Sequence, residues 1–146
     1  MPSCAPLPTE PQAGAPARER TRVLVVDDQP ASAQTLMLLL EMEGYDARLA
    51  GQGGEALRIA RTFRPHAVLL DIGLPDMSGF EVASRLREDP HGQQALLIAL
   101  TGYSERESRQ RAAQAGFDVH LVKPADIDRL LALLADPQAA RRCQAA

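Results

Sequence analysis

Residues 23–28 read Val-Leu-Val-Val-Asp-Asp, a short apolar run that ends in two adjacent carboxylates. Such runs are typical of strands that are buried on both faces of a parallel sheet. Ligands of parallel α/β sheets collect at the carboxyl edge of the strands. Three later apolar runs also end in one polar residue each, and these are Asp71, Thr101 and Lys123. We therefore expect an α/β fold in which carboxylates, a hydroxyl and an ammonium group meet at one edge.

The pattern outside these runs alternates strands with helices, which predicts a parallel sheet covered by helices on both faces. Glycines follow two of the expected helices (Gly44 and Gly116), and serines that can act as N-caps precede two others (Ser78 and Ser104). We expect strands at residues 23–27, 46–50, 67–71, 96–101 and 119–122. We expect helices at residues 30–43, 53–63, 78–88, 105–115 and 126–135.

Composition predicts one compact domain without a bias toward nucleic acid or membranes. The 146 residues are 45% hydrophobic and 24% charged, and the formal net charge is −3. No apolar run approaches the roughly 20 residues that a bilayer span needs, and residues 1–20 lack the apolar segment of a secretory signal. We therefore expect a cytoplasmic protein that binds neither nucleic acid nor membrane.

The two ends of the chain differ in composition from its centre. Residues 1–20 contain five prolines, and such a segment cannot bury enough apolar surface to order itself. We expect a disordered Pro/Ala-rich tail or linker at 1–20, one domain at 21–136 and a short tail at 137–146. Neither a basic stripe nor a helix-turn-helix pattern follows the last expected helix, so we do not expect a DNA-binding output domain.

Asp27, Asp28 and Asp71 are the candidate metal ligands. A simpler interpretation makes one of the first two the N-cap of the helix that begins at Pro30. Capping needs only one acid, however, and three adjacent negative charges would repel one another unless a divalent cation offset them. A ligand set made only of oxygens favours Mg²⁺ or Mn²⁺ over zinc.

An anion site is expected beside this cation site. Lys123 ends an apolar strand, so we expect its charge to point across the carboxylates rather than into solvent as an ordinary surface lysine. The bond from Lys123 to Pro124 is expected to be cis, because X-Pro bonds adopt this form at modest cost. Thr101 would be an ordinary β-branched strand residue in the simplest interpretation. Its hydroxyl, together with the N–H of Gly102, could instead bind an anionic oxygen next to Asp71.

These motifs together resemble the response-regulator receiver domain of two-component and phosphorelay systems. The resemblance covers about residues 22–135, with order and spacing intact. It implies a flavodoxin-like, doubly wound five-stranded parallel sheet with strand order 2-1-3-4-5 and five helices. The residues that carry it are the acidic pair after Val25-Val26, the stretch Asp71-Ile-Gly-Leu-Pro-Asp-Met-Ser-Gly79, Thr101-Gly102 and Lys123-Pro124.

The resemblance also implies roles for single residues. Asp71 would accept a phosphoryl group from a phosphohistidine on a histidine kinase or a histidine phosphotransfer protein. Mg²⁺ would be bound by Asp28, Asp71 and the carbonyl of Gly73, and by Asp27 through water. The chain would then catalyse only its own phosphorylation and slow dephosphorylation, so it would not be an enzyme that acts on an external substrate.

The phosphate-facing positions match the family only in part. Lys123 would pair with the phosphoryl oxygens, and Thr101 would close on the acyl phosphate as a switch. The family usually places Tyr or Phe three residues before the lysine, where this chain has His120. An imidazole at that position could add pH sensitivity, although a solvent-facing histidine is the simpler interpretation. The aromatic residue that often follows Pro124 is replaced by Ala125.

The helix expected at 30–43 is apolar on more than one side. Residues that point away from the sheet are either isolated surface apolar side chains or a docking patch for a helical phosphodonor. At about 100° per residue, the side assigned to the sheet holds Ser32, Leu36, Leu39, Leu40 and Glu43. The side assigned to partner docking holds Ala31, Leu38 and Met42.

We expect a stand-alone phosphoacceptor, monomeric or weakly dimeric, that signals to an unknown downstream protein by contact. One alternative is the receiver domain of a hybrid histidine kinase, with residues 1–20 as the interdomain linker. Another is a pseudo-receiver that acts as a constitutive interaction module, which the intact acidic set with Thr101 and Lys123 argues against. A phosphatase with an aspartate nucleophile would need a second acid two residues after the first, where Asp71 is followed by Gly73.

Overall fold

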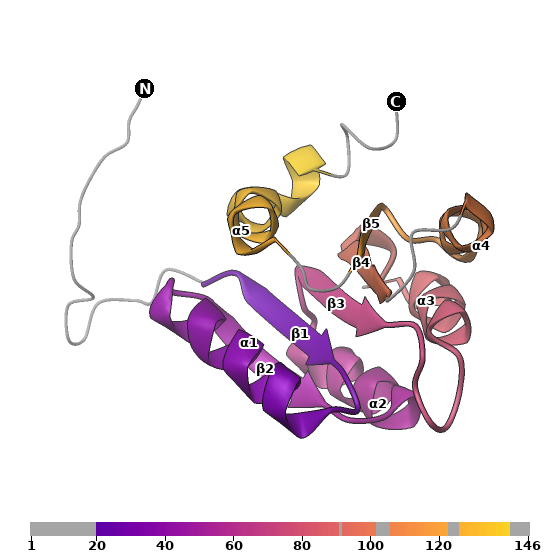
Figure 1. The fold of residues 1–146 in the computed structure, drawn as a ribbon, viewed down its shortest axis with the longest axis horizontal. Coiled ribbons are helices and arrows are strands. Elements are labelled where there is room, and N and C mark those ends of the chain that lie inside the picture. The colour runs from indigo at the N-terminus through magenta and orange to yellow at the C-terminus, as the bar shows by residue number, and fades with distance from the viewer. Residues whose placement is uncertain (1–19, 91, 102–105, 123–125, 141–146) are drawn as a thin grey trace.

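A computed structural model describes residues 20–90, 92–101, 106–122 and 126–140 of the chain (Figure 1). Within these residues, strands and helices alternate as the sequence predicts. A short 3₁₀ turn, η1 (Gly92–Gln94), and a turn of helix at residues 137–140 were not predicted as separate elements. The strands are β1 (Arg22–Val26), β2 (Asp46–Ala50), β3 (Ala67–Asp71), β4 (Leu96–Thr101) and β5 (Val119–Val122). The helices are α1 (Pro30–Met42), α2 (Gly53–Phe63), α3 (Gly79–Glu88), α4 (Arg106–Ala115) and α5 (Ile127–Ala135).

The strands form one parallel sheet in the order β2-β1-β3-β4-β5. This order confirms the doubly wound, flavodoxin-like topology. Strand β2 lies on one side of β1, and strands β3, β4 and β5 follow on the other side. The direction in which successive strands are added to the sheet therefore reverses between β1 and β3. At such a switch point the flanking loops diverge and leave a crevice at the carboxyl edge. Val26 of β1 is paired with Leu70 of β3 at that edge.

Side chains alternate between the two faces of each strand and build two apolar layers. On one face, Val23 and Val25 pack with the buried side chains of α1 and α5. On the other face, Leu24 and Val26 pack with those of α2 and α3. Figure 1 shows this arrangement, with α1 and α5 on one side of the sheet and α2, α3 and α4 on the other. All five residues of β3 are buried, as expected for a strand covered on both faces.

Helix α1 packs on the sheet with a face that matches the predicted one only in part, through Leu36 and Leu40. Ser32 and Glu43 were assigned to the sheet, but both are exposed, so that part of the assignment is wrong. The helix buries a stripe with the i, i+3, i+4, i+7 spacing of one helical face. Small Ala33 opens that stripe where Ser32 had been expected. The buried and partly buried members are Ala33, Leu36, Met37 and Leu40.

Helix and strand ends agree with most of the sequence signals. The hydroxyl of Ser78 accepts the N–H of Phe80 at 3.0 Å and caps α3. Gly44 and Gly116 follow α1 and α4 with positive φ, which favours glycine. Strand β1 ends at Val26, one residue earlier than expected. The cap expected at Ser104 lies outside the described residues.

Among the described residues, none of the helices has the length and apolar character needed to cross a bilayer.

Candidate functional site

Three carboxylates meet at the carboxyl edge, beside the point where the strand order reverses. Asp27 and Asp28 follow β1 directly, and Asp71 is the last residue of the neighbouring β3. One carboxylate oxygen from each residue can be chosen so that all three lie within 4.8 Å of one another. We call these residues the acidic cluster. The structure therefore brings together the three acids that the sequence predicted as metal ligands.

The members of the acidic cluster differ in exposure. Asp27 and Asp71 are 6% and 9% exposed, whereas Asp28 is exposed to solvent. Charges that are removed from water and placed side by side destabilise a fold unless an opposite charge accompanies them. A cation at this edge would offset that repulsion, and it could reach the cluster from the side of Asp28.

Backbone N–H groups orient two of the three carboxylates. The Oδ1 atom of Asp27 accepts the N–H of Gln29 at 2.9 Å. The Oδ1 atom of Asp71 accepts the N–H of Gly73 at 3.0 Å. Neither bond goes to an N–H inside α1: the N-cap of that helix is Gln29, which makes no side-chain cap hydrogen bond, and Pro30 is its first residue. The simpler interpretation of Asp27 or Asp28 as the side-chain cap of α1 is therefore wrong.

The acidic cluster has the chemistry and the spacing of a Mg²⁺ site. Its donors are all oxygens, which a hard cation prefers. Opposite ligands around Mg²⁺ lie about 4.2 Å apart at bond lengths of about 2.1 Å. The cluster oxygens lie within 4.8 Å of one another, so small side-chain movements would bring Asp28 and Asp71 to one ion with Asp27 close beside it. Gly73, the further ligand that the resemblance implies, is exposed beside Asp71.

Thr101 reaches the same edge from β4. Strand β4 pairs with β3 on the side away from β1, and Asp71 is opposite Leu100 in the register. Thr101 lies one residue further along and is 6% exposed. The N–H of Ile72, which follows Asp71, donates to the carbonyl of Leu100 at 3.2 Å. The end of β3 is thus held directly beside the end of β4.

Three of the predicted site residues, Gly102, Lys123 and Pro124, lie outside the described residues, and so does the expected cis bond. Strand β5 ends at Val122, which is opposite Thr101 in the register. The residue that comes next in the sequence is Lys123. The described part of β5 therefore ends at the carboxyl edge of the sheet, which is the edge where Lys123 was expected.

His120 lies within the sheet and not on the free surface. It is opposite Ala99 in the pairing of β4 with β5. The residue is half-buried, and its Nε2 atom is buried. The simpler interpretation of a solvent-facing histidine is therefore wrong. Val119 and Leu121 point to the opposite face, where they join the core with α5.

The residues assigned to partner docking lie on the outer face of α1. Ala31 is exposed, Leu38 is 58% exposed and Met42 is 81% exposed. We call these three residues the α1 patch. Helix α1 begins at Pro30, two residues after Asp28, so the patch starts next to the acidic cluster.

Sequence reasoning missed the role of Asp76, although it quoted the motif that contains this residue. The Asp76 carboxylate accepts the N–H of Gly53 at 2.8 Å and the N–H of Gly54 at 2.9 Å. These bonds lower the pKa of Asp76, with the bond to Gly54 as the larger cause. The sequence gives one indication that α2 needs a cap from elsewhere: the helix opens with two glycines after Gln52. In the structure Gln52 makes no side-chain cap hydrogen bond.

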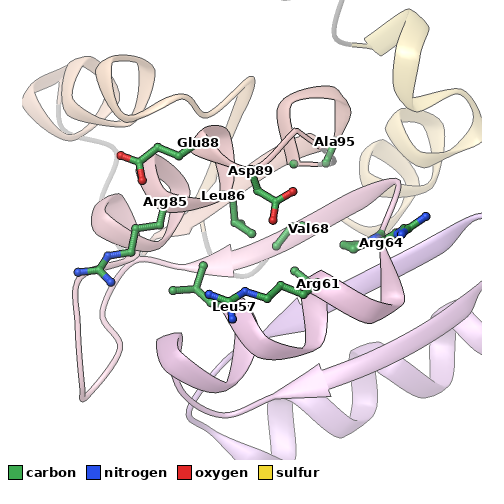
Figure 2. Close-up of a pocket in the computed structure, with 12 residues that line it drawn as sticks. Leu57, Arg61, Arg64, Val68, Arg85, Leu86, Glu88, Asp89 and Ala95 are labelled. Carbon is green, nitrogen blue, oxygen red and sulfur yellow. The ribbon is translucent and has the colours of Figure 1, made fainter.

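A separate cavity of about 220 Å³ lies between α2 and α3 (Figure 2). Its apolar floor includes Leu57, Val68 and Leu86, and none of the acidic-cluster residues lines it. Figure 2 shows that the side chains of Arg64 and Arg85 point away from one another, so their charges do not converge on one position. Arg85 instead pairs with Glu81 at 2.7 Å. We assign this cavity no part in the site.

Comparison with known proteins agrees with the fold. Residues 23–135 match the model of the response regulator receiver domain family. A 14.6 kDa protein in the sodA1 3′ region of Leptolyngbya boryana is 39% identical over 112 residues, which cover 77% of this chain and 86% of that protein. The probable transcriptional regulatory protein TcrX of Mycobacterium tuberculosis is 42% identical over 116 residues. The match covers 77% of this chain but only 49% of TcrX.

Solved structures of response regulators have the same fold as this chain. A CheY-like response regulator receiver domain protein from Methanospirillum hungatei superposes with a TM-score of 0.76 and 29% identity. That match covers 86% of this chain and 99% of the other. The chemotaxis response regulator CheY4 of Vibrio cholerae superposes with a TM-score of 0.75 and 30% identity, covering 80% of this chain and 98% of the other.

Proposed function

Because this chain belongs to the response regulator receiver family, we propose that Asp71 accepts a phosphoryl group from a phosphohistidine on a partner protein. The observation that carries this proposal is the acidic cluster, which lies at the switch point of the sheet with Asp71 at the end of β3. Receiver domains are signalling modules and not enzymes in the usual sense. The chemistry proposed for this chain is therefore limited to its own phosphorylation and slow dephosphorylation.

The proposed step exchanges one bond to phosphorus for another. A carboxylate oxygen of Asp71 forms a bond to phosphorus while the bond from phosphorus to the histidine nitrogen breaks. The nitrogen keeps the electron pair of that bond and takes a proton from solvent. Phosphoryl transfer passes through a loose transition state, so catalysis consists mainly of positioning and charge neutralisation. The N–H of Gly73, which donates to Asp71 Oδ1 at 3.0 Å, orients the nucleophile.

Mg²⁺ is the cofactor that the site would hold. Asp28, Asp71 and the carbonyl of Gly73 would bind the ion directly, and Asp27 would bind it through water. When bound, the ion supplies positive charge that offsets the negative charge of the carboxylates and of the incoming phosphoryl oxygens. The exposed carboxylate of Asp28 and the buried carboxylates of its neighbours suit entry of the ion from solvent.

Thr101 and Lys123 are proposed to contact the phosphoryl group after transfer, with the N–H of Gly102 beside them. Thr101 is buried at the end of β4, one residue past the partner of Asp71 in the register. Its hydroxyl would close on the acyl phosphate, and the Lys123 ammonium group would pair with the phosphoryl oxygens. These contacts would convert the chemical change at Asp71 into a change at the ends of β4 and β5.

We propose that a histidine kinase or a histidine phosphotransfer protein docks on the α1 patch. Receiver domains interact with such proteins, and their phosphohistidine must reach Asp71 at the edge next to α1. Ala31 lies at the end of α1 next to that edge, and Leu38 and Met42 continue an exposed apolar surface along the same outer face of the helix. The downstream target is proposed to be a protein, without nucleic-acid or membrane partners. We propose that this chain is a monomer or a weak dimer and that it meets the phosphodonor in the cytoplasm.

The observed similarities support two arrangements of the whole protein. The chain spans 89% of the polar-differentiation response regulator DivK of Brucella anthropi at 32% identity, which supports a stand-alone receiver. It also superposes on the signal receiver domain of a histidine kinase from Syntrophus aciditrophicus with a TM-score of 0.74 at 27% identity, which supports a receiver of a hybrid kinase. Both arrangements use the same acidic cluster.

Calorimetric titration with MgCl₂ tests the metal site of this proposal. Asp28→Asn removes one negative charge from the cluster and should lower Mg²⁺ affinity at least about tenfold, the loss typical even of residues outside the ligand shell. Asp46→Asn, a change on β2 outside the cluster, should leave the affinity unchanged. Wild-type protein that binds no Mg²⁺, or an Asp28→Asn variant with wild-type affinity, would contradict the proposed site.

A further inference from the structure

The loop between β3 and α3 is connected to the start of α2 by one side chain. We call residues 72–78 the site loop, because it begins directly after Asp71. Both oxygens of its Asp76 accept backbone N–H groups of α2, Oδ1 from Gly53 and Oδ2 from Gly54. Donor and acceptor are 22 and 23 residues apart in the sequence, so these bonds join two elements that only the fold brings together. Figure 1 shows the site loop passing beside the start of α2.

Helix α2 depends on this contact because its own N-cap does not supply one. Gln52 makes no side-chain cap hydrogen bond, and the first N–H groups of a helix have no partner within the helix. A carboxylate is well suited to that end, where the helix dipole favours negative charge. Asp76 thus acts as a cap supplied by a different segment, and the α2 end and the site loop hold each other in place.

Close packing reinforces the connection. A Cβ atom built on Gly53 would lie 2.5 Å from the Cγ atom of Met77 and 2.8 Å from a methyl carbon of Val82. The site loop therefore lies directly against the α2 backbone, at a distance that only glycine allows. At the far end of the loop, the N–H of Gly79 donates to the carbonyl of Ile72 at 2.9 Å. The loop is closed at its ends and attached to α2 through Asp76 and Met77.

The same loop carries the backbone that faces the acidic cluster. Gly73 lies two residues after Asp71, donates its N–H to that carboxylate, and is exposed, with open space around its Cα except for the Asp71 side chain. Its two neighbours in sequence, Ile72 and Leu74, are partly buried and pack against the core, whereas Pro75 and Asp76 further along the loop are exposed. The position of Gly73 is therefore set by these two side chains together with the attachment of the loop to α2 through Asp76.

We infer that Asp76 is a positioning residue of the phosphoacceptor site, which holds the site loop on α2 and thereby places the Gly73 backbone for the cation beside Asp71. This inference rests on the proposed function, because it assigns the Gly73 carbonyl to Mg²⁺. It assigns no contact between Asp76 and the ion.

The test compares Mg²⁺ affinity in the full chain and in three variants by isothermal titration calorimetry. Asp76→Ala removes both bonds to α2 and should weaken Mg²⁺ binding about tenfold, as for other residues outside the ligand shell. Asp76→Asn keeps one acceptor oxygen and should fall between wild type and Asp76→Ala. Asp136→Ala is the matched control, since this exposed aspartate also accepts a backbone N–H, that of Ala139 at 3.1 Å, at the end of α5. Its affinity should equal that of wild type.

Hydrogen exchange on the same samples separates positioning from general loss of stability. Asp76→Ala should speed exchange of the site-loop amides and of Gly53 and Gly54, while the amides of β1 and β4 keep wild-type protection. Circular dichroism confirms that each variant is folded at the temperature of titration. Unchanged Mg²⁺ affinity in Asp76→Ala, with normal binding by wild type, would overturn this inference and leave the proposed function intact. Wild-type protein that binds no Mg²⁺ would overturn both.

Discussion

At the residue scale, the acidic cluster combines two buried carboxylates with one exposed carboxylate. Asp27 and Asp71 retain 6% and 9% of their exposure, and Asp28 faces solvent. Removal from water strengthens the effect of each charge on its neighbours. A cation that binds through Asp28 would therefore relieve repulsion at Asp71 as well, and it would change the stability of the fold together with the reactivity of the nucleophile.

Asp76 makes the stability of the fold depend on pH in a defined direction. Hydrogen bonds from Gly54 and Gly53 hold its pKa below the ordinary value of 3.8. The unfolded chain then binds more protons at this group than the folded chain does, so the contribution of Asp76 is present above about pH 3.8 and is lost as the pH falls through the folded pKa. Wild type should therefore have a higher Tm than Asp76→Asn at pH 7, and the difference should narrow below pH 4.

Thermal unfolding followed by circular dichroism between pH 7 and pH 3 measures this difference. All other ionisable groups are the same in the two proteins, so their effects cancel in the comparison. A Tm difference that stays constant across the range would show that the charge of Asp76 does not matter for its bonds to α2.

The place of single residues in the site was predictable from the sequence where those residues lie at the end of a strand. Asp27, Asp28, Asp71 and Thr101 each follow or end a short apolar run, and parallel strands present such positions at one edge. Asp76 was not predictable in this way, because its partners are backbone N–H groups more than 20 residues away. The burial of His120 could not be predicted either, because it depends on the elements that cover β5.

At the element scale, α1 serves the core with one face and offers the α1 patch with the other. Its buried stripe contains Ala33 and Leu40, while Leu38 and Met42 are mostly exposed on the opposite side. Exposed apolar side chains along the outer face of a helix that starts beside the nucleophile fit docking of a second helix. The apolar character of α1 thus reflects packing on the sheet on one side and, on our docking proposal, binding of the phosphodonor on the other.

Leu38→Glu should slow phosphoryl transfer from a cognate kinase or phosphotransfer protein about tenfold, or about 1.4 kcal/mol, because it buries a charge in an apolar contact. Phosphorylation by acetyl phosphate should be unchanged, since this small donor needs no docking surface. The measurement is the initial rate of transfer from labelled phosphodonor.

The matched control for this variant is Thr62→Glu, which adds the same charge to an exposed position of α2 on the other face of the sheet. It should transfer at the wild-type rate. Equal rates for Leu38→Glu and wild type would remove the docking proposal without affecting the assignment of Asp71.

The elements were largely predictable, and their errors have local causes. The bounds expected for the four strands after β1 agree with the structure. For β3 and β4 the reason is that buried parallel strands are continuous apolar runs with sharp polar ends. The side of α1 that faces the sheet was predicted only in part: Leu36 and Leu40 pack on the sheet, but Ser32 and Glu43 are exposed. So many apolar residues in one helix leave its angle undetermined by periodicity alone. The turn η1 was missed since short 3₁₀ segments have no periodic pattern.

At the scale of the whole molecule, Arg87 connects several elements at once. Its guanidinium group donates to the carbonyls of Gly92, Ala95 and Gly116 at 2.8–2.9 Å and pairs with Asp118 at 2.7 Å. The Asp118 carboxylate also accepts the N–H of Leu97 at 3.0 Å. One half-buried pair thereby joins α3 to η1, to β4 and to the segment between α4 and β5.

Arg87→Ala should lower the free energy of unfolding by about 3 kcal/mol, because it removes the cation that pairs with the mostly buried Asp118 and the donor of several carbonyl groups. Arg85→Ala is the control on the same helix. Its pair with Glu81 is exposed, with 54% and 47% of the two side chains accessible, so its loss should cost less than about 1 kcal/mol. Urea denaturation at constant m-value measures both. Equal losses would mean that burial of the Arg87 pair is not the cause.

The strand order was predictable only through the resemblance to receivers, because apolar runs and turn signals do not say which strands are neighbours. The parallel arrangement followed from the residues alone, since a helix separates every pair of successive strands. Contacts such as the Arg87 network could not be predicted, because they join segments whose proximity is set by the complete fold.

The central claim is that Asp71 accepts phosphorus with the help of a cation held by its neighbours. Intact-mass spectrometry after incubation with acetyl phosphate tests this most directly, in MgCl₂ and in EDTA. We predict one phosphoryl adduct on wild type in MgCl₂, and no adduct in EDTA or on Asp71→Asn. Wild type without an adduct in MgCl₂, or an equal adduct on Asp71→Asn, would contradict the claim.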